Sequence, residues 1–164
     1  MGEYQLDAEC FNVDVDDFDR CIRKAQAALG DKAARWHEQA VSLYVGEYLD
    51  NLYYDWCQPE RARLREACVG ALRALTTHYA STDPQRAIAF GQRALAIDPL
   101  LEDVHLEMMR CYHRQSDRAA VIRQYRQLEL ALRDHLDIQP DETAQALYRT
   151  LMESFSGSNG LAVL

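Results

Sequence analysis

The chain has 164 residues, of which 48% are hydrophobic and 27% charged, and its formal net charge is -8. This is the composition of an ordinary globular domain, and no apolar run has the length that a membrane span needs. The sequence has no basic stripe of the kind that binds nucleic-acid backbones and no secretory signal. We therefore expect a cytoplasmic protein with no membrane contact that does not by itself bind DNA strongly.

The negative charge is concentrated at the N-terminus. Residues 1–20 contain seven acidic residues against Arg20 alone, so most of the net charge lies there and the rest of the chain is nearly balanced. From Asp14, apolar residues recur at helical spacing as far as Leu29. Asp31 is expected to cap a second helix, which Gly46 ends.

Five further helices are predicted from apolar spacing, capping residues and prolines. A long one covers residues 59–81, and Asp83 followed by Pro84 starts the next. That helix ends at Asp98, because the residue before a proline is pushed out of helical geometry. The last three are expected at residues 101–115, 117–132 and 144–155. No segment of the body alternates with a period of two, so we predict no strand there.

The central helices repeat with the period of a tetratricopeptide motif. Leu72 aligns with Leu106, a shift of 34 residues, and the same shift aligns Asp83 with Asp117. Gly91 stands where that motif usually has a large aromatic residue. The sequence therefore predicts an all-α, tetratricopeptide-like α-α superhelix of about seven antiparallel helices. Two repeats rarely suffice alone, so the flanking helices are expected to complete the stack.

The sequence contains no catalytic constellation, no cofactor-binding motif and no metal-binding motif, so we predict no enzyme activity, no cofactor and no metal. His105, Cys111 and His113 could be imagined around a metal, but core and surface positions on helices explain them better. The five cysteines are an odd number and widely spaced, which favours reduced, buried thiols.

One candidate partner-binding site follows from the repeat. Stacked tetratricopeptide pairs form a concave face lined by the first helix of each repeat. Five residues occupy positions on those helices that the core stripes leave outward, and we name them the candidate groove: Arg73, Thr76, Arg110, His113 and Arg114. Their basic character suits an acidic peptide or helix of a partner. A solvated helix face is the alternative interpretation.

Several separated stretches resemble the bacterial transcriptional activator domain of SARP-type, AfsR-like regulators. These stretches are "GEYQLD", "VDVDDFDR", "AVSLYVGEYLDNLYYDW", "ERARLRE" and "LDIQPDETAQALYRTL". Together with the repeat they cover almost the whole chain. Asp137 departs from the pattern, because the family often has glycine at that position.

The resemblance implies a protein-interaction domain that follows a winged-helix DNA-binding domain and recruits or positions transcription machinery. Residues 1–13 would then be a linker or the last strand of that winged-helix domain, residues 14–155 the activator domain, and residues 156–164 a C-terminal tail. The implied partners are proteins or neighbouring domains of the same regulator, and a homodimer stays open. The alternative is a generic tetratricopeptide adaptor or scaffold that is not tied to transcription.

Overall fold

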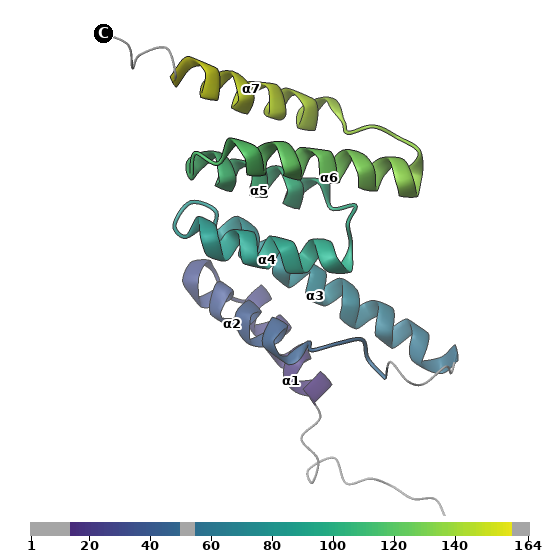
Figure 1. The fold of residues 1–164 in the computed structure, drawn as a ribbon. Helices are drawn as coiled ribbons and strands as arrows, with labels where there is room; N and C mark the ends of the chain where they lie inside the picture. The colour runs from purple at the N-terminus through teal and green to yellow at the C-terminus, as the bar shows by residue number, and fades with distance from the viewer. Residues whose placement is uncertain (1–13, 50–54, 159–164) are drawn as a thin grey trace, which may run out of the picture. The chain divides into compact units, whose positions relative to one another are not determined.

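The computed structural model describes residues 14–49 and 55–158, and this part of the chain is all-α (Figure 1). The helices are α1 (Asp14–Gln26), α2 (Gly30–Leu43), α3 (Gln58–Tyr79), α4 (Pro84–Ile97), α5 (Glu102–Arg114), α6 (Arg118–Leu136) and α7 (Glu142–Ser158), with a short 3-10 helix, η2 (Asp55–Cys57), before α3. The described residues contain no strand, so the predicted all-α fold is confirmed. The predicted N-terminal segment, residues 1–13, lies outside them.

The chain divides into two compact units, and the boundary falls inside α3 between Ala71 and Leu72. Unit 1 includes α1, α2 and the first part of α3. Unit 2 includes the rest of α3 and the helices α4 to α7, so it contains the whole candidate groove.

In unit 1, α1 and α2 pack together through small and aromatic side chains. Phe18 and Ala25 of the predicted apolar stripe are buried in α1, together with Cys21. The Phe18 ring lies 6.3 Å from the ring of Tyr44, which follows α2. Asp19 of α1 also accepts two hydrogen bonds from the Arg63 guanidinium of α3, at 2.8 and 2.9 Å.

The turn between α1 and α2 differs from the sequence prediction. Helix α1 ends at Gln26, and Leu29, which the apolar stripe included, is 91% exposed. Gly30 has φ +56° and begins α2, and Leu29 rather than Asp31 occupies the N-cap, with no side-chain cap. The positive φ of Gly30 lets α2 begin directly after Leu29, because glycine adopts this conformation at little cost.

Unit 2 follows the predicted caps closely. Asp83 accepts a hydrogen bond from the Arg86 backbone N–H at 3.1 Å, with Pro84 at the first helical position. Asp117 accepts from Ala120 N–H at 2.8 Å, and Asp141 accepts from Ala144 N–H at 2.7 Å. Each carboxylate satisfies a backbone donor that has no partner within its helix, which fixes where α4, α6 and α7 begin.

The backbone at Asp137 explains why the family favours glycine there. Asp137 ends α6 with φ 56° and ψ 37°, the left-handed conformation of a helix C-cap. Glycine adopts this conformation without strain, and aspartate is among the few other residues that tolerate it. The departure from the family pattern therefore leaves the turn geometry intact.

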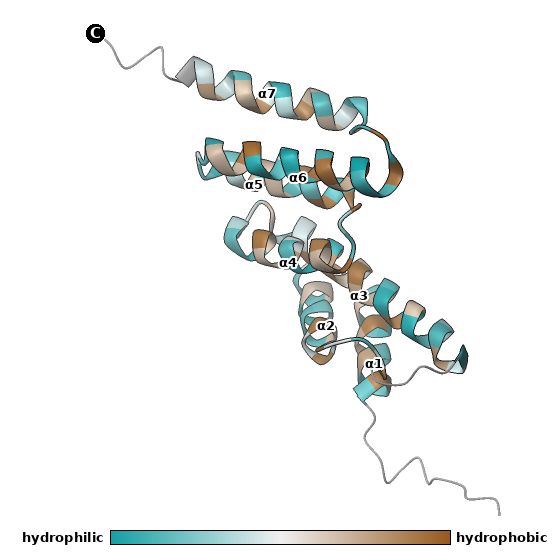
Figure 2. Ribbon diagram, turned by 45° about the vertical axis from the view of Figure 1, so that its right-hand side comes forward, coloured by the Kyte–Doolittle hydropathy of each residue, from teal (hydrophilic) through white to brown (hydrophobic). Residues whose placement is uncertain are grey.

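The core of unit 2 comes from the apolar faces of its helices, which alternate with polar stretches in Figure 2. One cluster joins Leu128 and Leu132 of α6 with Ala144 of α7. Another joins Met109 of α5 with Val121 and Tyr125 of α6 and Leu151 of α7. The exposed residues of α7 are mostly polar: Glu142, Thr143, Ala146, Arg149, Thr150, Glu153, Ser154 and Ser156. A polar outer face is typical of the helix that caps a repeat array.

The packing of α4 against α5 accounts for Gly91. A Cβ added at Gly91 would lie 2.7 Å from Sδ and 2.9 Å from Cγ of Met108. The Met108 side chain therefore occupies the space into which a large aromatic residue would project at this position.

Ala94, one helical turn after Gly91, is fully buried. We expect Ala94→Trp to lower the free energy of unfolding by about 1–3 kcal/mol, because a large side chain forced into a packed helix crossing displaces its neighbours. Thermal or urea unfolding measures the effect. An unchanged melting temperature would show that the predicted repeat register is wrong.

Candidate interaction sites

The candidate groove contains exposed arginines that are already paired with acidic side chains of α5. Arg73 donates to Oδ2 of Asp103 from Nε at 2.9 Å and from Nη2 at 2.7 Å. Arg110 donates to Oε2 of Glu107 at 2.6 Å. The face is therefore a mixture of both charges rather than a uniformly basic patch.

His113 and Arg114 extend the candidate groove at the C-terminal end of α5. Nε2 of His113 lies 2.5 Å from the Ser154 hydroxyl of α7, and its ring meets the Phe155 ring edge-on at 4.8 Å. Arg114 donates to the Cys111 thiol at 3.3 Å. His113 thus joins α5 to α7, whereas Arg114 of α5 is exposed to solvent.

The prediction that Thr76 faces outward is wrong. Thr76 is only 1% exposed, and its hydroxyl donates to the Leu72 carbonyl at 2.9 Å. That bond within the helix satisfies the hydroxyl and lets it lie in the core. In the candidate groove, Arg73 and Arg114 are therefore exposed, and Arg110 and His113 are half-buried.

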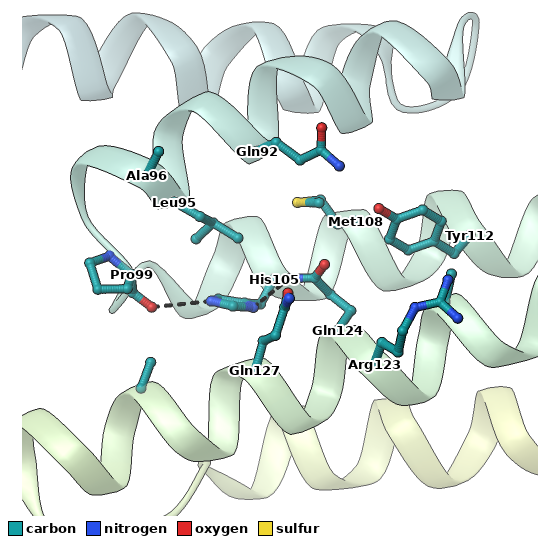
Figure 3. Close-up of a pocket in the computed structure, with 12 residues that line it drawn as sticks. Gln92, Leu95, Ala96, Pro99, His105, Met108, Tyr112, Arg123, Gln124 and Gln127 are labelled. Carbon is teal, nitrogen blue, oxygen red and sulfur yellow. Dashed lines mark hydrogen bonds between the residues drawn. The ribbon is translucent and has the colours of Figure 1, made fainter.

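A pocket between α4, α5 and α6 is a second candidate site, which the sequence did not predict. It has a volume of about 550 Å³, within the roughly 300–1,000 Å³ usual for small-molecule sites. We call it the α4–α6 pocket. In Figure 3, Tyr112 and Arg123 lie at one end of it, Pro99 lies at the other, and Gln92 lies above Met108 between them. Met108 and Leu95 contribute apolar surface between them.

A buried hydrogen-bond chain forms one wall of the α4–α6 pocket. Nε2 of His105 lies 3.1 Å from the Pro99 carbonyl, and Nδ1 lies 2.7 Å from Nε2 of Gln124. A carbonyl can only accept, so Nε2 bears the proton and Nδ1 accepts from the Gln124 amide. His105 is 2% exposed and Gln124 is 4% exposed. The neutral imidazole is thus fully satisfied and holds α6 to α5 and to the turn after α4.

The state of His105 predicts how stability depends on pH. Burial lowers the pKa of His105 below its usual value, and burial also lowers the pKa of His37. As the pH falls, His105 and His37 are therefore protonated at a higher pH in the unfolded chain than in the folded one. Stability is lost as the pH falls below about 6.5. We expect the free energy of unfolding from urea titrations to fall between pH 7.5 and 5.5.

Replacing His105 with glutamine should reduce this pH dependence, since the amide can still donate to the Pro99 carbonyl but does not titrate. His37 should preserve part of the slope. Equal slopes for the wild type and His105→Gln would show that His105 does not contribute.

Tyr112 provides a hydroxyl donor in the α4–α6 pocket. Burial raises the pKa of Tyr112, while a side-chain hydrogen bond with Gln92 and the charge of Arg123 oppose that rise. The Tyr112 hydroxyl therefore shares a hydrogen bond with Gln92 and lies within the influence of the Arg123 charge.

Three further observations concern metal sites, membrane spans and thiols among the described residues. Residues 14–49 and 55–158 contain no group of three or more His, Cys, Asp or Glu side chains placed to hold a metal ion. No helix in this part of the chain is both long enough and apolar enough to cross a membrane. Cys21, Cys57, Cys68 and Cys111 are all buried thiols, so the candidate interactions depend on other side chains.

Comparison with known protein families identifies the class. The family model of the bacterial transcriptional activator domain matches residues 13–152, which is most of the chain. The chain therefore belongs to this family, and the suspected resemblance is confirmed. The family is a regulatory domain of transcriptional activators rather than an enzyme family. A search of curated proteins and a search of solved structures each found no match.

Proposed function

We propose that this chain is the protein-interaction domain of a bacterial transcriptional activator. Residues 14–155 would form the regulatory domain, downstream of a winged-helix DNA-binding domain that lies outside these 164 residues. The match of the family model over residues 13–152 carries this proposal. Its partners would be transcription machinery or neighbouring domains of the regulator.

The exposed arginines of the candidate groove are the proposed contact surface. Arg73 and Arg110 are paired with Asp103 and Glu107, but these pairs are partly exposed to solvent. An exposed ion pair contributes only about 0–1 kcal/mol, so a carboxylate of a partner can replace the internal one at little cost. Arg114 adds a third guanidinium one turn after Arg110. An acidic helix or peptide of a partner fits this arrangement.

The isolated chain is expected not to bind duplex DNA specifically. Its formal net charge is -8, and a protein that neutralises few phosphates gains little from counterion release. Fluorescence anisotropy of a labelled duplex at low salt measures this directly. Tight binding that weakens steeply with added salt would contradict the assignment of DNA recognition to another domain.

Tethering tests the proposed function and separates it from the generic adaptor. Residues 1–164 are fused to an unrelated bacterial DNA-binding domain whose operator lies upstream of a weak promoter. We expect transcription of the reporter to rise above the level given by the DNA-binding domain alone. A folded fusion that occupies the operator without raising transcription would favour an adaptor not tied to transcription.

A further inference from the structure

We propose that the α4–α6 pocket binds a small organic acid, with its carboxylate at Arg123 and Tyr112 and its apolar body against Met108 and Leu95. The proposal is independent of the candidate groove, because none of the groove residues lines this pocket.

The first argument is that a cation and a hydroxyl group lie at the same end of the pocket. Arg123 is exposed and forms no ion pair with another residue of the described ranges 14–49 and 55–158. Arg123 and Tyr112 both line the pocket, and the charge of Arg123 acts on the Tyr112 hydroxyl. A guanidinium and a hydroxyl group can both donate to one carboxylate, and the bond from the guanidinium is of the strong, charge-assisted kind.

The second argument is that the pocket also presents apolar side chains, Leu95 and Met108 among them, and that its walls are firmly held. Met108 is 1% exposed and is packed over Gly91, so its side chain forms a fixed surface rather than a mobile one. The hydrogen bonds of His105 with Pro99 and Gln124 hold the opposite wall. A site with a fixed shape loses less entropy on binding than one that must be ordered by its ligand.

The third argument concerns the charge and size of the ligand. Arg123 is the single guanidinium among the residues that line the pocket, and none of these residues has a carboxylate. A monoanion with an apolar body thus matches this pocket better than a polyanion. A volume of about 550 Å³ accommodates such a molecule. Because α4 belongs to one repeat and α5 and α6 to the next, its binding would stabilise the contact between them.

Binding of sodium hexanoate to the full chain tests the proposal by isothermal titration calorimetry and amide NMR shifts. Hexanol serves as the uncharged match, and inorganic phosphate as the anion without an apolar body. We expect saturable hexanoate binding, with amide shifts confined to α4, α5 and α6. Neither hexanol nor phosphate should bind comparably. A short peptide with acidic side chains is titrated in the same way, to distinguish a site for a free organic acid from a site for the carboxylate of a protein side chain.

Two variants and one control locate the binding. Arg123→Gln should weaken hexanoate binding at least about tenfold, since it removes a charged donor, and Tyr112→Phe should weaken it several-fold. Arg126→Gln removes an exposed arginine of the same helix that does not line the pocket, and should bind as the wild type does. The melting temperature without hexanoate shows that each variant folds.

Three results would overturn the proposal. Hexanoate could fail to bind saturably, or Arg123→Gln and Tyr112→Phe could both bind it as tightly as the wild type. If the acidic peptide binds and hexanoate does not, the pocket is a docking site for a side chain of a protein. If phosphate binds and hexanoate does not, the pocket is a simple anion site.

Discussion

Leu128→Ala is expected to lower the free energy of unfolding by about 2–5 kcal/mol, because it deletes a fully buried side chain and leaves a cavity. Leu128 of α6 is 0% exposed and lies in a cluster with Leu132 and with Ala144 of α7. Leu100 and Leu106 pack against the same cluster. The substitution therefore weakens the contacts of three segments at once, and urea unfolding followed by circular dichroism measures the loss.

Leu130→Ala is the matched control, since it makes the same chemical change two residues away on α6. Leu130 is 46% exposed, and substitutions at exposed positions usually change stability by under about 0.5 kcal/mol. Similar losses for the two variants would mean that the face of α6 assigned to the core is wrong.

The helix boundaries of unit 2 could be predicted because local chemistry determines them. Asp83, Asp117 and Asp141 cap backbone donors only three residues away, so their neighbours in sequence suffice. The buried stripe of α3 was predictable for the same reason, as its Leu64, Cys68, Leu72 and Leu75 follow helical spacing and are all buried.

Two features of the candidate groove were missed. Thr76 was assigned outward because the core stripe left its position out, yet it is buried, and its bond to the Leu72 carbonyl within α3 removes the cost of burial. Asp103 pairs with Arg73 across thirty positions of sequence, which no local rule predicts. The Glu107–Arg110 pair is different, since its spacing of three residues is a recognised helical signal.

The α4–α6 pocket could not be predicted from the sequence either. Its polar residues come from three helices, and their spacing along the chain matches no ligand-binding motif. Gly91 was the available signal, because a missing side chain at a helix crossing changes what its neighbours can fill. Only the position of Met108 shows how that space is used.

Replacing Arg73, Arg110 and Arg114 together with serine is expected to abolish activation while leaving the domain folded. Each residue is at least partly exposed, so each substitution should change stability by under about 0.5 kcal/mol. The loss of activation would follow from the loss of three guanidinium groups that can each bind a carboxylate bidentately. Circular dichroism and thermal unfolding establish that the variant folds.

The matched control replaces three exposed arginines outside the candidate groove with serine: Arg126, Arg133 and Arg149. It changes the net charge by the same amount, and it also breaks one exposed ion pair, between Arg133 and Asp134. A general effect of charge would therefore reduce activation equally in both variants.

The most direct test compares these two triple variants with the wild type as fusions to the unrelated DNA-binding domain, at equal cellular levels and equal operator occupancy. The quantity measured is reporter transcription. We predict wild-type activation for the Arg126, Arg133 and Arg149 variant, and only the level of the DNA-binding domain alone for the Arg73, Arg110 and Arg114 variant. Wild-type activation by the latter would contradict the claim that this face contacts the transcription machinery.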